Sequence, residues 1–261
     1  MLENIIRKIG SKVITLIESS GRITLFFIIG VINIFVGSFQ LDKVLDHTWF
    51  IGCKSIFVIL LTGAFTGMVI GLQGYYSLVK FGSEGALGAA VALTMIRELG
   101  PVFTAIMIAA RAGSAMTAEI GVMRISEQID ALKTMHINPV RFLFTPRIIA
   151  SIISFPLLTA IFDIVGIFGG YISGSLMLGI NRYDYMETVV KSVHINDITG
   201  GFLKALVFAV VVTTISCYRG YYTHNFGGFG ARGVSLSTTN AVVQSCISIL
   251  IVDYIITFFL V

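Results

Sequence analysis

The hydrophobic positions of this 261-residue chain form long, nearly uninterrupted runs separated by short polar segments. The runs cover roughly residues 23–41, 55–79, 87–118, 146–180, 200–218 and 239–261. A helix needs about 20 consecutive apolar residues to cross the hydrocarbon core of a bilayer, so each run is a candidate transmembrane helix. The pattern predicts an all-α, polytopic membrane protein whose residues 1–261 form a single domain.

The distribution of basic residues indicates which runs cross the membrane, because such residues collect on the cytoplasmic side. Three basic groups should share that side: Arg7 to Arg22, Arg111 to Arg147, and Arg219 to Arg232. Three runs separate the first two groups, and three crossings would place those groups on opposite sides. We interpret the shortest of these runs as part of an elbow over 23–50 that dips into the membrane and returns. The alternative is six crossings with an inverted tail. The five crossings that we predict are 55–79, 87–118, 146–180, 200–218 and 239–261.

The first 22 residues predict an amphipathic helix lying on the membrane surface. Apolar residues recur there at helical spacing, and Arg7, Lys8 and Lys12 lie among them. The apolar run that follows is longer than the core of a signal peptide, and no A-x-A-like cleavage site follows it. We therefore expect this segment to remain in the mature protein.

The composition agrees with a membrane protein and excludes several other classes. Hydrophobic residues make up 56% of the chain and charged residues 12%, whereas soluble domains average about 45–50% and about 25%. The net charge of +4 is small and gives no reason to expect a nucleic-acid partner. The three cysteines lie in or beside apolar runs without C-x-x-C spacing, so neither a disulfide framework nor a metal site is predicted. We expect no cofactor.

Two adjacent charges interrupt the second predicted crossing. Arg97 and Glu98 lie about ten residues into 87–118. An ionised side chain at mid-membrane costs about 2.5–3.5 kcal/mol on insertion scales, so such residues face protein or a wet cavity. Pro101, which follows closely, can kink the helix and free a backbone carbonyl. The alternatives are a polar position in a substrate path and a structural ion pair with another helix. Under the first, the path is lined by Arg97, Glu98, Gln73, Tyr75 and Tyr76.

Two further acids stand alone in apolar runs. Asp163 lies in the third predicted crossing and Asp253 in the fifth. Each is a candidate proton or cation site, and the alternative is a buried acid with a capping or pairing partner.

Two series of glycines predict close packing between helices. Gly63, Gly67 and Gly71 fall four residues apart in the first crossing, and 166, 170 and 174 are glycines in the third. Small residues at this spacing allow helix backbones to approach closely. The interface can be one that slides between states or one that is static.

Residues 119–135, between the second and third crossings, predict a cytoplasmic amphipathic helix. Val122, Ile125, Ile129 and Leu132 share one face, and charged residues occupy the other. Such a helix is typical of a docking surface for a soluble partner, although an ordinary interfacial helix has the same pattern. Its candidate contact residues are Glu119, Arg124, Glu127, Asp130 and Lys133.

These charged segments carry a family resemblance. Residues 97–102 (RELGPV), 110–115 (ARAGSA), 119–124 (EIGVMR) and 127–132 (EQIDAL) resemble the MlaE/YrbE family of ABC-transporter permeases. Residues 138–141, 146–147, 233–234 and 238–243 continue the similarity, which spans nearly the whole chain. Departures occur at Ala110, where glycine is commoner in the family, and at 135–138 and 230–237.

The resemblance implies a homodimeric permease that works with a cytoplasmic ATPase and an outer MCE-domain protein to move phospholipid or a related lipid. It implies a bacterial inner membrane, or the related plastid envelope as the alternative. The chain has no G-x-x-x-x-G-K-[ST] motif, so energy from nucleotide must come from another polypeptide and the chain is not itself an enzyme. Two other functions remain open: an ion-coupled secondary transporter using Asp163 and Asp253, and a non-transporting scaffold.

Overall fold

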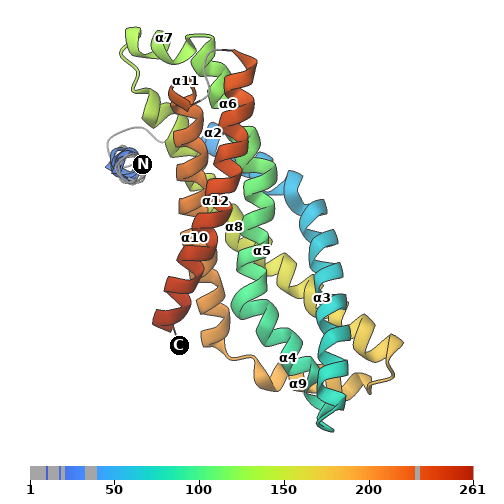
Figure 1. The fold of residues 1–261 in the computed structure, drawn as a ribbon. Helices are drawn as coiled ribbons and strands as arrows, with labels where there is room; N and C mark the ends of the chain where they lie inside the picture. The colour runs from blue at the N-terminus through green and yellow to red at the C-terminus, as the bar shows by residue number, and fades with distance from the viewer. Residues whose placement is uncertain (1–9, 11–17, 19–20, 33–39, 227–229, 261) are drawn as a thin grey trace, which may run out of the picture.

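The computed structural model describes residues 10, 18, 21–32, 40–226 and 230–260, and this part of the chain contains helices and no strand. Five helical segments are long and apolar enough to cross a membrane (Figure 1): Leu41–Val79, Glu84–Ile125, Pro139–Met177, Ile195–Tyr221 and Ala231–Leu260. The prediction of an all-α membrane protein with five long apolar helices is therefore confirmed.

The long segments are built from shorter helices joined without loops. The first contains α2 (Leu41–Ile51), η1 (Cys53–Ser55) and α3 (Ile56–Val79). After η2 (Glu84–Ala86), the second runs through α4 (Leu87–Thr94), η3 (Met95–Leu99), α5 (Gly100–Ile108), η4 (Ala109–Gly113) and α6 (Ser114–Ile125). The third is α8 (Pro139–Tyr171) with η5 (Ile172–Met177), the fourth α10 (Ile195–Tyr221) and the fifth α12 (Ala231–Leu260). The elements η3, η4 and η5 are π-helical turns. Such turns often occur at functional sites, so these three are candidate functional positions.

Short polar helices lie at the two ends of the long ones. Helix α7 (Gln128–Thr134) and α11 (Thr223–Phe226) lie at one end, and α9 (Arg182–Ser192) lies at the other (Figure 1). Tyr185 anchors α9, since its side chain is fully buried and its hydroxyl donates to the carbonyl of Ile167 at 3.0 Å.

The N-terminal elbow is described only in part. A short apolar helix covers Gly21–Ile32, which at 1.5 Å per residue is about 18 Å long. That length is below the roughly 30 Å of a hydrocarbon core. Phe26 fixes this helix to the bundle through edge-on contacts with Phe144 and Tyr218, whose ring centroids lie 5.5 and 5.9 Å away. Most of the predicted surface helix and residues 33–39 of the elbow lie outside the described residues, so a returning elbow stays a prediction.

The two glycine series pack against each other. All three glycines of the first series, Gly63, Gly67 and Gly71, are buried. A Cβ placed on Gly67 would lie 1.8 Å from the carbonyl oxygen of Gly166, and one on Gly71 would lie 3.0 Å from the Cα of Gly170. The glycine spacing predicts close packing between helices without naming the pair. The structure shows that the first and third crossings form it, and only glycine fits at the contact between residues 67 and 166.

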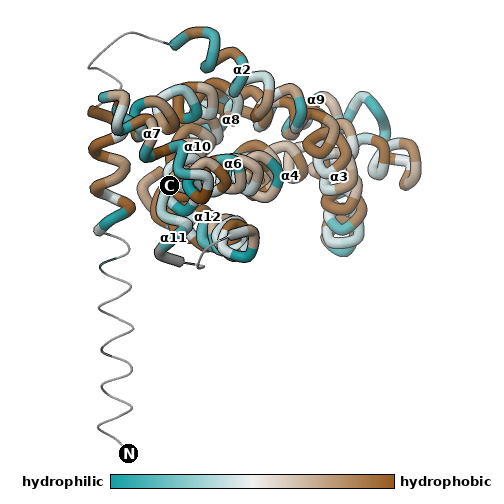
Figure 2. The backbone as a smooth tube through the Cα atoms, turned by 90° about the horizontal axis from the view of Figure 1, so that it is seen from above, coloured by the Kyte–Doolittle hydropathy of each residue, from teal (hydrophilic) through white to brown (hydrophobic). Residues whose placement is uncertain are grey.

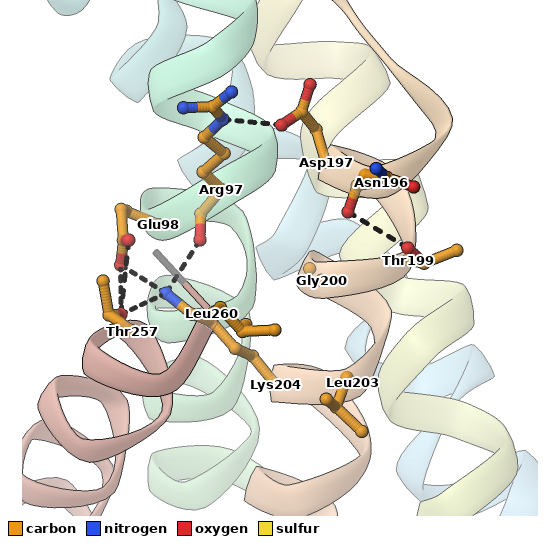
Figure 3. A pocket seen from close by; sticks show the side chains of 11 residues that line it. Arg97, Glu98, Asn196, Asp197, Thr199, Gly200, Leu203, Lys204, Thr257 and Leu260 are labelled. Carbon is orange, nitrogen blue, oxygen red and sulfur yellow. Dashed lines mark hydrogen bonds and ion pairs between the residues drawn. The ribbon is translucent and has the colours of Figure 1, made fainter.

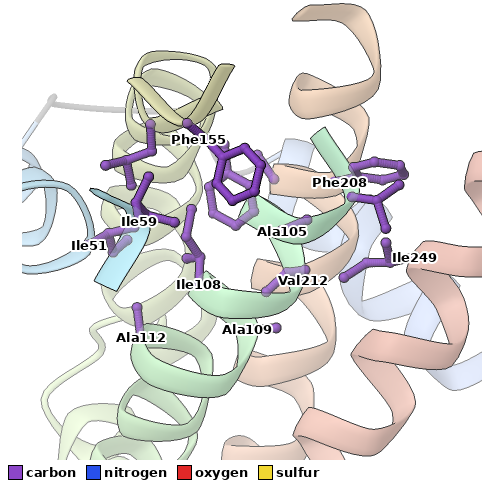
Figure 4. Packing of buried hydrophobic residues seen from close by; sticks show 14 of the residues in the cluster. Ile51, Ile59, Ala105, Ile108, Ala109, Ala112, Phe155, Phe208, Val212 and Ile249 are labelled. Atoms are coloured by element: carbon purple, nitrogen blue, oxygen red, sulfur yellow. The ribbon is translucent and has the colours of Figure 1, made fainter. Parts of the chain in front are cut away.

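A hydrophobic core joins the crossings at mid-height. Its central members include Ile59 of α3, Ala105 and Ile108 of α5, Phe155 of α8 and Phe208 of α10 (Figure 4). Seen from above, hydrophobic residues run along all the long helices (Figure 2). The outward apolar side chains form the lipid-facing surface. The inward ones pack between the helices and hold them together.

The single helix predicted over 119–135 is wrong. The first half belongs to α6, which continues the second crossing to Ile125, and the second half is the separate helix α7. Between them Glu127 adopts the left-handed conformation with φ of 58°, which ends one helix and redirects the chain into the next. The predicted common apolar face is consequently divided: Ile129 is fully buried, while the side chain of Val122 is 54% exposed.

Candidate functional site

A charged cleft of about 690 Å³ opens between η3, the start of α10 and the end of α12 (Figure 3). The start of α10 and the end of α12, which bound it, lie away from α7 along the bundle (Figure 1). Its lining residues are Arg97, Glu98, Asn196, Asp197, Thr199, Gly200, Gly201, Leu203, Lys204, Thr257 and Leu260. The structure thus brings both charges of the second crossing to one cavity with polar groups from two other crossings.

Lys204 is the centre of the charge network in this cleft. Its side chain is 2% exposed, yet its Nζ donates to Glu98 Oε2 at 2.6 Å and to Thr257 Oγ1 at 2.7 Å. Asp253 Oδ1 forms an ion pair with the same Nζ at 3.1 Å, outside good hydrogen-bond geometry. A buried ammonium is tolerated in a membrane only when paired in this way. The lysine therefore ties the second, fourth and fifth crossings together.

The lack of an N–H at Pro101 explains a further contact of Lys204. Proline has no N–H, so the carbonyl four residues earlier, that of Arg97, lacks its helical donor. Lys204 Nζ donates to that carbonyl at 2.9 Å. Gly201, one turn earlier on α10, permits the approach, because a Cβ there would lie 2.5 Å from the carbonyl oxygen of Ile96. The freed carbonyl expected from the sequence is present and is satisfied by a buried cation.

Arg97 pairs with an acid at the outer boundary of the cleft. Its Nε donates to Asp197 Oδ1 at 2.7 Å, and the arginine side chain remains 53% exposed. Asp197 also accepts the backbone N–H of His194 at 2.9 Å, which caps the first turn of α10. The acid is thus held in place by the helix start, and the guanidinium is left open to the cleft.

Three residues predicted for the same path lie elsewhere. Gln73, Tyr75 and Tyr76 are on α3, and none of them is among the described residues that line the charged cleft. Tyr75 packs against the hydrophobic core and against Tyr76, with ring centroids 5.8 Å apart. Gln73 and Tyr76 are exposed. Within one copy of the chain, the second, fourth and fifth crossings line the charged cleft, and the first does not.

The sequence reasoning missed Lys204 and Asp197. The signal for Lys204 was available, because a lone lysine inside the apolar run 200–218 is as unusual as Arg97 and Glu98. Asp197 lies before that run and looks like a loop residue in the sequence. Its pairing joins positions 100 residues apart, which no local pattern reveals.

The two isolated acids have different environments. Asp253 has the cationic partner described above, as expected for a paired buried acid. Asp163, on α8, lines a smaller neighbouring cleft, and its Oδ1 has no hydrogen-bond partner among the described residues. Within the same part of the chain, no group of three or more histidines, cysteines or acids could hold a metal ion.

The cytoplasmic candidates form a second charged cluster around α7. Asp130 Oδ1 accepts from Arg124 at 2.9 Å and from Lys133 at 3.0 Å. These hydrogen bonds, the one from Lys133 first, hold the pKa of the Asp130 carboxyl below its ordinary value. Arg124 Nε also donates to His224 Nδ1 at 3.3 Å, and partial burial followed by the Arg124 charge lowers the pKa of His224. The cluster fixes α7 to α6 and α11.

The other two cytoplasmic candidates, Glu119 and Glu127, differ in their ion pairing. Glu119 forms an ion pair at 2.9 Å with Arg147 of α8, whose side chain is 3% exposed. Glu127 is exposed at the bend between α6 and α7. The structure therefore holds Glu119 and Asp130 in internal contacts and presents Glu127 outward.

Five long apolar helices, with paired charges among them and a cleft lined by those charges, are the features of a polytopic membrane transport protein. The family model described as Permease MlaE matches residues 44–259. The chain belongs to the MlaE permease family, and its five long apolar helices agree with a multi-pass inner-membrane protein.

Relatives agree over nearly the full length. The chain is 39% identical over 257 residues to the "Probable ABC transporter permease protein" of Rickettsia bellii, covering 98% of each chain. It is 39% identical over 262 residues to the "Intermembrane phospholipid transport system permease protein MlaE" of Haemophilus influenzae, covering 98% of this chain and 97% of that one. It is also 35% identical over 229 residues to the chloroplastic protein TRIGALACTOSYLDIACYLGLYCEROL 1 of Arabidopsis thaliana, covering 88% and 64%.

Proposed function

We propose that this chain is the permease of an ABC transporter that moves phospholipid or a related lipid between membranes. A separate cytoplasmic ATPase supplies the energy, and an MCE-domain protein exchanges lipid on the outer side. The observation that carries the proposal is the charged cleft of about 690 Å³ between the long apolar helices, in a chain of this family. The phospholipid named for the Haemophilus relative supports the substrate class.

The chemistry of the cleft fits a zwitterionic headgroup. Arg97 presents a guanidinium that is 53% exposed, and guanidinium groups bind phosphate oxygens well. Glu98 is 40% exposed and would attract an ammonium group. Leu203 and Leu260 supply apolar lining beside them. A lipid phosphate at Arg97 and its amine at Glu98 would share one site with the acyl chains against apolar walls.

Transport assays test this assignment. Arg97→Ala and Glu98→Gln should each slow lipid transfer by the reconstituted complex while leaving its assembly intact. Gln73→Ala, at an exposed position of α3 outside the cleft, is the matched comparison. Wild-type transfer by both cleft variants would remove the two charges from the path.

The surface around Glu127 is our candidate for ATPase contact. It lies beside exposed apolar side chains, with Val122 54% and Met135 68% exposed. Glu119, Arg124, Asp130 and Lys133 would then act as the internal frame that transmits movement of α7 to the second and third crossings. Closure of an ATPase dimer would push this end and rock the glycine-packed helices.

A pull-down distinguishes a residue that contacts the ATPase from residues that only support the fold around it. Glu127→Lys should release the ATPase without unfolding the permease, since this exposed side chain makes no hydrogen bond or ion pair with the described residues. Glu84→Lys, exposed at the opposite end of the bundle, is the control. Unchanged co-purification of the ATPase with Glu127→Lys would refute the assigned contact.

A second copy of the chain would complete the assembly. The most apolar stretch of α12 is only 11% buried, and Thr239 and Asn240, which precede it on the same helix, are exposed. An amide facing hydrocarbon is costly, so a protein surface is the better partner for this face. In a cysteine-free background, Val243→Cys should form disulfide-linked dimers, and Phe57→Cys on the outer face of α3 should not. The reverse result would place the dimer contact on the first crossing.

A further inference from the structure

Among the described residues around the charged cleft, three acids meet two cations. Arg97 pairs with Asp197 at 2.7 Å. Lys204 pairs both with Glu98 at 2.6 Å and with Asp253 at 3.1 Å. When all five side chains are ionised, the group carries one negative charge in excess. An excess charge between apolar helices is disfavoured, so the arrangement favours a further cation beside these acids.

The ammonium group of Lys204 has no donor left for Asp253. A lysine has three N–H donors. Two of them reach Glu98 Oε2 at 2.6 Å and Thr257 Oγ1 at 2.7 Å, and the third reaches the carbonyl oxygen of Arg97 at 2.9 Å (Figure 3). Asp253 Oδ1 lies 3.1 Å from the same Nζ, yet it is buried and accepts no hydrogen bond from a described residue. Asp253 is therefore held near the lysine by charge alone.

The two carboxylates beside Lys204 differ in their access to the cleft. Glu98 lines the cleft, and its side chain is 40% exposed. Asp253, on α12, is not among the described residues that line the cleft, and its Oδ1 is buried. A ligand in the cleft therefore meets Glu98, while Asp253 Oδ1 stays against the lysine.

A ligand ammonium at Glu98 would compete with Lys204 for the same carboxylate. Lys204 is 2% exposed, and an ammonium buried to that degree is strongly disfavoured without a counter-ion. Asp253 supplies the counter-ion, because the N–H that Glu98 gives up can turn to Asp253 Oδ1, which is 3.1 Å away. The ligand ammonium also neutralises the excess negative charge of the group. Glu98 can thus bind the ligand without leaving a buried cation unpaired.

We propose that Asp253 is a positioning residue, which keeps Lys204 paired while Glu98 binds the ammonium group of a lipid headgroup. The proposal rests on the proposed transport of lipid through this cleft. It specifies a substrate with a primary ammonium group, such as phosphatidylethanolamine, because N–H donors are needed to replace that of Lys204 at Glu98. Asp253 does not contact the lipid and acts through Lys204.

Lipid binding to the full chain, purified in mild detergent with its co-purifying subunits, tests this role. The probes are phosphatidylethanolamine and phosphatidylglycerol with identical acyl chains, which differ in the ammonium group. Asp253→Asn should raise the Kd for phosphatidylethanolamine about tenfold, as expected for the loss of one hydrogen bond to a charged group. The same variant should not weaken the binding of phosphatidylglycerol, which places no ammonium at Glu98.

Three controls accompany this measurement. Asp253→Asn leaves Lys204 paired with Glu98, so its thermal unfolding should show a folded protein. Asp253→Glu, which keeps the carboxylate, should bind phosphatidylethanolamine more tightly than Asp253→Asn does. Asp184→Asn, at an exposed position of α9, should change neither Kd.

A double variant and a transfer assay separate this role from a structural one and from transport itself. In a Glu98→Gln background, Asp253→Asn should raise the Kd for phosphatidylethanolamine no further, since Asp253 acts by freeing Glu98. The proposal is overturned by a wild type that does not bind phosphatidylethanolamine, by an unchanged Kd in Asp253→Asn, by an equal loss for both lipids, or by additive losses in the double variant. ATP-dependent transfer is measured on the same preparation. If the wild type transfers neither lipid, the proposed function fails, and the two Kd values still decide the role of Asp253.

Discussion

Replacing Lys204 by methionine tests the charge network most sharply. Lys204→Met keeps the length of the side chain but removes the cation that contacts Glu98, Asp253 and Thr257. It also leaves the carbonyl of Arg97, which Pro101 deprives of its helical donor, without its 2.9 Å hydrogen bond. The variant therefore creates uncompensated charge and an unsatisfied backbone acceptor inside the bundle.

The magnitude follows from the burial of each partner. Breaking a buried ion pair by removing one member costs about 3–5 kcal/mol. The side chain of Glu98 is 40% exposed, so solvent screens much of its share, whereas Asp253 is 19% exposed and carries more of the loss. At about 2–4 °C per kcal/mol, as for soluble domains of 150–250 residues, the unfolding midpoint should fall by about 6–20 °C.

Thermal unfolding in mild detergent is the assay, and two variants act as controls. Lys191→Met removes an exposed pair with Glu187 on α9, so it should change the midpoint little. Adding Asp253→Asn to Lys204→Met removes the stranded charge and should recover part of the loss. A Lys204→Met midpoint close to that of the wild type, or a further fall in the double variant, would refute the assigned network.

Three further predictions concern packing, capping and the cytoplasmic cluster. Gly67→Ala should lower the unfolding midpoint clearly, because its Cβ would meet a backbone carbonyl at 1.8 Å, whereas Gly85→Ala has open space and should not. Asp197→Ala should lower the free energy of unfolding by about 0.5–2 kcal/mol, because the cap of α10 is lost. Asp197→Asn should keep most of the stabilisation from the cap while losing the ion pair with Arg97. The Arg124 contact needs neutral His224, whose pKa is lowered in the fold, so its stabilisation is present above about pH 6.5 and is lost on acidification. Intrinsic-rate-corrected hydrogen exchange of α7 should rise between neutral and acidic pH in the wild type, and a flat profile identical to that of His224→Gln would contradict this.

Much of the membrane architecture could be predicted from local patterns. Five of the six long apolar runs correspond to long helices, and the four-residue glycine spacing marks positions of close helix packing, because both signals are local. Which two helices pack there could not be predicted. Arg97 and Glu98 were found for the same reason: charge is expensive in an apolar run.

The features that could not be predicted from the sequence depend on contacts between distant segments of the chain. The partners Lys204 and Asp197 lie more than 90 residues beyond Arg97 along the chain, so only the folded bundle brings them to one cleft. The break at Glu127 depends on one left-handed residue that no glycine or proline signals. Gln73, Tyr75 and Tyr76 lie near a helix end, a position that does not determine which neighbour they face, so their place in the path stays a prediction.

Lipid transfer between vesicle populations tests the central claim most directly. The permease should be reconstituted alone, and then with the ATPase and the outer lipid-binding protein that co-purify with it. The account predicts ATP-dependent transfer only from the full complex, with loss of that transfer in Arg97→Ala. Transfer by the chain alone, driven by a proton or sodium gradient and indifferent to ATP, would contradict it.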